Sequence, residues 1–145
     1  MTEIFANPVF MAAVWAWAVA QTLKVLFYSM RERRVNLRWL VTMGGMPSSH
    51  SATVAGLATA VGLREGVRST PFAIALAFAL VVMYDAAGVR RAAMTQARIL
   101  NQIVDELFQG HPISETRLRE LLGHTPVEVF VGAILGIAIA IFYIQ

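Results

Sequence analysis

Two short segments of this 145-residue chain contain the residue types that bind and transfer a phosphate group. Residues 47–50 read Pro-Ser-Ser-His, residues 123–128 read Gly-His-Thr-Pro-Val-Glu, and an apolar run follows each segment. The free amides of a helix N-terminus attract phosphate, and small hydroxyl residues are common there. A histidine at such a position has a pKa near neutrality and can transfer a proton. The pair of segments therefore predicts an enzyme that acts on phosphate at a membrane surface.

The second segment places a histidine and a carboxylate on one helical face. His124 and Glu128 are four residues apart, about one helical turn. A carboxylate bonded to one imidazole nitrogen fixes the tautomer and leaves the other nitrogen as a nucleophile. The alternative is a surface histidine with a helix-terminal glutamate.

The first segment offers a proton donor beside two hydroxyl groups. We expect His50 to donate a proton to a leaving oxygen, with Ser48 and Ser49 binding the phosphate. An ordinary helix cap would explain the same residues, although capping and anion binding are compatible.

Cations near two further helix ends could hold phosphate oxygens. Lys24 and Arg31 are seven residues apart, about two turns, so both can lie on one face. A phosphate clamp and ordinary membrane snorkelling both fit this pair. Asp85, Arg90 and Arg91 close the third apolar segment. We expect Asp85 to be a structural ion-pair partner and one arginine to bind phosphate, with Arg90 the first choice and Arg91 the second.

The composition excludes a water-soluble globule. Hydrophobic residues make up 57% of the chain and charged residues 14%, whereas a soluble domain carries about 25% charged residues. The net charge is +3, and the positively charged residues lie between the apolar runs. This placement favours an anionic membrane or lipid over nucleic acid as the partner. The chain has no cysteine, so disulfides and thiolate metal sites are excluded.

Four apolar segments predict the architecture. They cover about residues 8–28, 52–63, 72–84 and 129–144. The middle two are short, so a full crossing would bring flanking polar residues to membrane depth, where they must line a cavity or find partners. Between residues 90 and 123, apolar residues at helical spacing predict an amphipathic helix that ends at residues 110–112, and a short second helix over residues 114–122. We therefore predict an all-α integral membrane helical bundle with four transmembrane helices and an interfacial amphipathic helix, in a single domain over residues 1–145.

Two further patterns concern orientation and assembly. With four spans, ten of the 12 Lys and Arg residues fall on one side, which the positive-inside rule places in the cytoplasm. Gly132 and Gly136 form a small-xxx-small pattern suited to close helix packing. A homodimer formed through these two glycines is therefore one expected assembly.

Taken together, the motifs resemble the type 2 phosphatidic acid phosphatase and vanadium haloperoxidase superfamily, and in particular its divergent bacterial branch. That family's pattern is Lys-x6-Arg-Pro, then Pro-Ser-Gly-His, then Ser-Arg-x5-His-x3-Asp. Lys24-x6-Arg31, residues 47–50 and His124-x3-Glu128 match its three parts in order, with Glu32 for the proline, Ser49 for the glycine and Glu128 for the aspartate. The clear departure is Leu118, where the third motif has an arginine, and Arg90 is our candidate replacement.

The resemblance implies a function and a mechanism. His124 would attack phosphorus and form a phosphohistidine, Glu128 would orient it, and His50 would protonate the leaving alcohol. The protein would be a lipid phosphate phosphatase of the bacterial inner (cytoplasmic) membrane, multi-pass and facing the cytoplasm, acting on a lipid phosphomonoester or pyrophosphate without a metal or cofactor. The alternatives are a non-catalytic membrane protein that binds anionic lipid or phosphate, and a small dimeric transporter.

Overall fold

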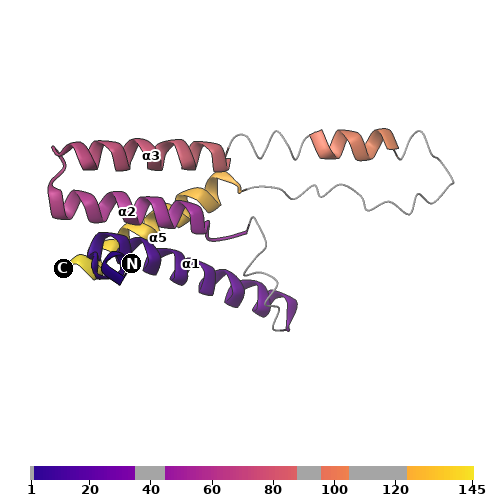
Figure 1. Ribbon diagram of the computed structural model, residues 1–145. Helices are drawn as coiled ribbons and strands as arrows, with labels where there is room; N and C mark the ends of the chain where they lie inside the picture. Colours follow the sequence, from indigo (N-terminus) through magenta and orange to yellow (C-terminus); the bar gives the residue numbers. More distant parts are fainter. Residues whose placement is uncertain (1, 35–44, 88–95, 105–123) are drawn as a thin grey trace.

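The computed structural model describes residues 2–34, 45–87, 96–104 and 124–145, and this part of the chain is helical without strands (Figure 1). A 3-10 helix, η1 (Thr2–Ala6), precedes α1 (Pro8–Glu32), α2 (Ser49–Glu65), α3 (Thr70–Ala87) and α5 (Pro126–Ile144). Each of the four predicted apolar segments thus forms one α-helix. Residues 96–104 are also helical, within the predicted amphipathic segment, and the rest of that segment lies outside the described residues.

Three of these helices are long and apolar enough to cross a membrane, namely α1, α3 and α5. The fourth, α2, has 17 residues and is rich in alanine, glycine, serine and threonine. It packs against α1, α3 and α5, and nine of its residues are buried. A helix surrounded by protein can carry polar residues that a lipid-facing helix cannot. The bundle of four helices is therefore confirmed, while a membrane crossing by α2 stays a prediction.

The helix starts are fixed by side chains that bind the free amide groups of the first turn. Asn7 caps α1, because its side-chain oxygen accepts hydrogen bonds from the N–H groups of Val9 and Phe10 at 2.9 and 3.2 Å. Ser48 and Thr125 cap α2 and α5 in the same way. Proline occupies the first turn of α1 and of α5, where its missing N–H costs no hydrogen bond.

Two glycines of α5 let its backbone touch that of α2. A Cβ atom on Gly132 would collide with the carbonyl oxygen of Ser48, and one on Gly136 would collide with that of Ala52. Both glycines are buried. The predicted small-xxx-small packing is confirmed, but it joins two helices of the same chain. These glycines are therefore not exposed to a second copy, and a homodimer stays a prediction that needs another surface.

Because of the directions of the helices, the two segments with the predicted histidines lie at one end of the bundle. The helices α2 and α5 begin at this end, and α1 and α3 finish there (Figure 1). Two backbone hydrogen bonds hold the arrangement: the Ser48 N–H donates to the Glu128 carbonyl at 3.1 Å, and the His124 N–H donates to the Ala86 carbonyl at 3.4 Å. Both predicted histidine segments therefore lie at the same end of the molecule.

Replacement of Gly136 by valine should destabilise the bundle strongly. The new side chain would collide with the backbone of α2 at Ala52, and overpacking of this kind costs about 1–3 kcal/mol or more. The measurement is thermal unfolding of the purified protein in detergent, followed by circular dichroism. Ala138→Val is the matched control, since Ala138 is exposed on the same helix. Equal melting temperatures for the two variants would contradict the close contact.

Candidate active site

The position of Lys24 follows from a stripe of alanines on α1. Ala12, Ala16 and Ala20 are four residues apart and fully buried, and the stripe faces α2, since a Cβ on Gly56 would lie 3.0 Å from the Cβ of Ala16. Lys24 is the next residue in this spacing and is only 2% exposed. Residues four apart share a helix face, so the lysine is directed into the bundle. The alternative for Lys24 was a side chain that extends to the membrane surface. That alternative does not fit a side chain buried to this degree.

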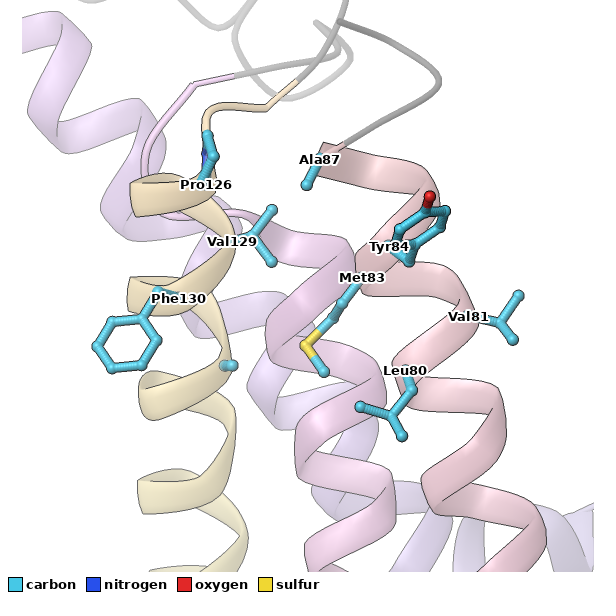
Figure 2. Close-up of a pocket in the computed structure, with 9 residues that line it drawn as sticks. Leu80, Val81, Met83, Tyr84, Ala87, Pro126, Val129 and Phe130 are labelled. Atoms are coloured by element: carbon cyan, nitrogen blue, oxygen red, sulfur yellow. The ribbon is translucent and has the colours of Figure 1, made fainter.

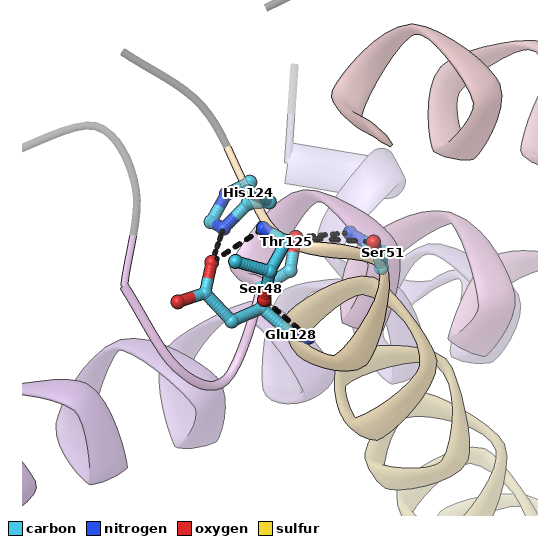
Figure 3. A network of polar contacts seen from close by, with 5 residues as sticks. All are labelled: Ser48, Ser51, His124, Thr125 and Glu128. Atoms are coloured by element: carbon cyan, nitrogen blue, oxygen red, sulfur yellow. Dashed lines mark hydrogen bonds and ion pairs between the residues drawn. The ribbon is translucent and has the colours of Figure 1, made fainter. Parts of the chain in front are cut away.

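Ser48 caps α2 at the same end. Its Oγ accepts hydrogen bonds from the Ser51 N–H at 3.3 Å and from the Ser51 hydroxyl at 3.0 Å (Figure 3). Ser48 and Ser51 are fully buried, and Ser49 is 5% exposed. The cap expected from the sequence is thus confirmed. A phosphate contact by Ser48 or Ser49 stays a prediction, and the partnership of Ser51 with the cap was missed, although its spacing of three from Ser48 is typical of such pairs.

Glu128 connects His124 to the start of α5. Its Oε2 accepts a hydrogen bond from the Thr125 N–H at 2.9 Å and lies 3.2 Å from Nδ1 of His124 (Figure 3). The Thr125 hydroxyl in return accepts from the Glu128 N–H at 3.3 Å, which completes a capping box. The role of Thr125 was missed, but the Thr-x-x-Glu spacing in residues 125–128 is the sequence signature of this motif.

The carboxylate determines the state of the His124 ring. Because a carboxylate oxygen only accepts, Nδ1 carries the proton in this bond and Nε2 of the neutral ring has a free lone pair. His124 is 4% exposed, and its Nε2 is buried without a hydrogen-bond partner in the described part of the chain. An unpartnered buried nitrogen is unfavourable unless a ligand completes it. The ring is therefore held in the form that a nucleophile requires.

Burial lowers the pKa of His124 below its ordinary value of 6.5. The hydrogen bond and the negative charge of Glu128 act in the opposite direction, while the positive charges of Lys24 and His50 lower the pKa further. Lys24 also interacts electrostatically with Glu128. These effects place four predicted site residues within reach of one another: Lys24, His50, His124 and Glu128.

His50 lies on the first turn of α2 beside His124. The two ring centroids are 6.0 Å apart and the rings are inclined at 67°. His50 is exposed at the end of the bundle, whereas His124 is buried. One histidine therefore has access to water and the other does not, which suits a proton carrier next to a nucleophile.

The described structure does not join Arg31 or Asp85 to this cluster. Arg31 is exposed on the last turn of α1, about 10 Å along the helix from Lys24, and is not among the charges that act on the His124 pKa. Asp85 is exposed at the end of α3. Arg90 and Arg91 lie outside the described residues, so their phosphate contacts and their pairing with Asp85 stay predictions. Among the residues that are described, no three His, Asp or Glu side chains are grouped as metal ligands.

The ends of α2 and α5 make this corner of the molecule favourable for an anion. Each helix N-terminus acts roughly as half a positive charge, although the caps already bind the Ser51 N–H in α2 and the Thr125 and Glu128 N–H groups in α5. The buried Lys24 ammonium adds to them, and Glu128 opposes them from the Nδ1 side of His124. The fold and site thus define a helical membrane protein with a histidine and carboxylate pair beside a buried lysine and two helix N-termini.

Comparison with known proteins agrees with this description. Residues 5–139 match the model of the "Divergent PAP2 family", and the chain belongs to that family. It is also similar to a Bacillus subtilis (strain 168) protein described as "Uncharacterized membrane protein YuiD", with 35% identity over 150 residues that cover 96% of this chain and 95% of the relative. No solved structure matches the chain. The family resemblance inferred from the motifs is confirmed.

The His124 pKa gives a prediction that does not depend on activity. Replacement of Glu128 by glutamine removes the charge that raises this pKa, so the pKa should fall further below 6.5. Nitrogen-15 NMR of labelled histidine in detergent micelles would measure the shift. Glu3→Gln, at an exposed carboxylate of η1, should leave the value unchanged. An unchanged or raised pKa in the Glu128 variant would contradict the bond.

The same pKa sets a dependence of stability on pH. Because folding lowers the pKa of His124, the unfolded chain takes up a proton below pH 6.5 that the folded chain does not. This contribution to the free energy of unfolding is therefore present above pH 6.5 and decreases as the pH falls. A difference in melting temperature between pH 7.5 and pH 5.5 that is smaller in His124→Asn than in the wild type would confirm the sign.

Proposed function

We propose that this protein hydrolyses a lipid phosphate through a phosphohistidine on His124. The observation that carries the proposal is the buried Nε2 of His124, which has no partner in the described residues while Glu128 holds the opposite nitrogen. Membership of the divergent PAP2 family supports a phosphatase-related role. The apolar helices support a substrate delivered from the membrane.

The first step transfers the phosphoryl group to the protein. The Nε2 lone pair of His124 attacks phosphorus, and the bond from phosphorus to the ester oxygen breaks. His50 gives its proton to the departing oxygen, which leaves as an alcohol or as a phosphomonoester. The attacking ring becomes positively charged, and Glu128, 3.2 Å from Nδ1, stabilises that charge.

The second step releases phosphate. Neutral His50 takes a proton from water, the water oxygen attacks phosphorus, and the bond from phosphorus to Nε2 breaks. Lys24 and the partial positive charge at the start of α2 stabilise the charge on the phosphate oxygens in both steps. Arg31, Ser48, Ser49, Arg90 and Arg91 are the further proposed phosphate ligands. Cations and amides supply the neutralisation in this scheme, so it includes no metal or cofactor.

The orientation in the membrane is part of the proposal. The site end of α1, α2, α3 and α5 would face the cytoplasm of a bacterial inner membrane, with the chain crossing it several times. With four spans, the sequence assigns ten of the 12 Lys and Arg residues to this side of the membrane.

One sequence observation favours a second function. Leu118 stands where the family pattern has its third arginine, which would weaken binding of the charge that develops at phosphorus. In this alternative the protein binds anionic lipid or phosphate without turnover. The following measurements separate the two functions.

Replacement of His124 by alanine should abolish phosphate release, because the attacking atom is removed. We expect a loss of about 10³-fold or more in kcat/KM on a lipid phosphate in mixed micelles. Brief incubation of the wild type with phosphorus-32-labelled substrate should trap an acid-labile phosphoprotein that the variant does not form. His111→Ala is the control, since no motif includes His111. Full activity of the His124 variant would exclude the mechanism, and binding without turnover by the wild type would favour the alternative.

The effect of replacing His50 by alanine on the rate of hydrolysis should depend on the leaving group. An alkyl phosphate needs a proton on its departing oxygen, whereas a nitrophenyl phosphate does not. The variant should lose about 10²-fold or more on the alkyl substrate and much less on the aryl substrate. Steady-state kcat on both substrates, with the phosphoprotein level followed in parallel, measures the difference. Equal losses on the two substrates would show that His50 is not the proton donor.

A further inference from the structure

An apolar groove lies between α3 and α5 beside the candidate active site. Its volume is about 730 Å³, within the range of small-molecule sites. Figure 2 shows Met83 and Leu80 from α3 and Val129 from α5 along it, and Ala133 of α5 also lines it. The groove is open on one side, and both helices that border it are candidate membrane spans. It is therefore a hollow that hydrocarbon can enter sideways from a bilayer.

One end of the groove lies close in the chain to His124. It extends for two helical turns, about 10 Å, from Leu80 and Ala133 to Ala87 and Pro126 (Figure 2). Pro126 is two residues from His124, whose N–H donates to the carbonyl of Ala86, the neighbour of Ala87. The segment that carries His124 thus forms the end of the groove.

The end of the groove near His124 has the residues expected where a membrane meets water. Tyr84 borders the groove near the end with His124 and is 78% exposed, and tyrosine is enriched where a bilayer meets water. Polar and charged residues collect immediately beyond it, at Lys24, Ser48 and His124, all of which are buried. An anionic group in the polar corner and an apolar chain in the groove would each have a complementary environment.

We propose that the groove between α3 and α5 holds one hydrocarbon chain of the phosphate-bearing lipid. This inference rests on the phosphate-binding part of the proposed function and adds the tail-binding site. It makes Ala133 a specificity-determining residue, because its small side chain leaves room in the groove at the end remote from Ala87 and Pro126. The substrate class is a lipid whose phosphate is attached close to one extended hydrocarbon chain.

Substitutions that fill the groove should affect long-chain substrates alone. Ala133→Phe should raise KM for dodecyl phosphate about tenfold and leave kcat/KM for butyl phosphate unchanged, because only the long chain needs the groove. Ala138→Phe is the matched control on the exposed face of α5, and Leu80→Trp fills the groove from α3. Melting temperatures equal to that of the wild type establish folding. No effect on dodecyl phosphate, or equal effects on both substrates, in the folded groove variants would overturn the proposal.

A labelling experiment tests the groove without turnover. Dodecyl phosphate with a diazirine in the middle of its chain is irradiated with the wild type and with His124→Asn in nonionic detergent. Label should map to residues 80–87 and 126–133, and unlabelled dodecyl phosphate should suppress it, whereas dodecyltrimethylammonium, with the same chain and the opposite charge, should not. Label on all exposed faces of α1, α3 and α5 alike, or without competition by dodecyl phosphate, would show an ordinary lipid-facing surface and overturn the proposal. If dodecyl phosphate suppresses labelling of the groove but the wild type releases no phosphate, the tail-binding site is supported and the proposed catalysis is rejected.

Discussion

The close contact between α2 and α5 is the constraint on which the rest of the structure depends. Without side chains at Gly132 and Gly136, the two backbones meet at Ser48 and Ala52, and the Ser48 N–H reaches the Glu128 carbonyl. The contact brings the start of α2 against the first turns of α5, which begins six residues before Gly132. The positive ends of both helix dipoles therefore lie on the same side of the bundle. A wider spacing would separate the two histidine segments as well.

Glu128 connects helix capping to chemistry. From the third position of α5 its side chain turns back to the Thr125 N–H and to Nδ1 of His124 with the same oxygen, while its backbone carbonyl accepts from Ser48. An aspartate is one methylene shorter and would have less reach for both bonds. This gives a physical reason for glutamate where the resembling pattern has aspartate. The capping box that starts the helix also fixes the orientation of the proposed nucleophile.

Much of this arrangement could be predicted from the sequence, because it depends on local spacing. The apolar runs predicted the four helices, and the spacing of His124 and Glu128 predicted their contact. The burial of Lys24 could also have been anticipated from the alanines at positions 12, 16 and 20, which continue to it. The central position of α2 could not be predicted from the sequence. A helix inside a bundle needs no lipid-facing surface, so its polar residues make it look like a poor candidate for a membrane span. The use of the glycine pair within one chain, and not between two, depends on distant backbone that no local pattern specifies.

The buried cation of the site supports the proposal that an anion binds there. A buried ammonium group is costly unless it is paired, and Lys24 is 2% exposed. Glu128 interacts with it, and the Oε2 of the same carboxylate is bonded to His124 and to Thr125. The lysine and the glutamate balance in charge, and the positive N-terminal ends of α2 and α5 are opposed by the negative C-terminal ends of α1 and α3 at the same end of the bundle. A proposed phosphate group at Nε2 of His124 would therefore be held locally, by Lys24 and the start of α2, on the side of the ring opposite Glu128, where the carboxylate does not repel it. The same features would bind and activate a phosphate ester.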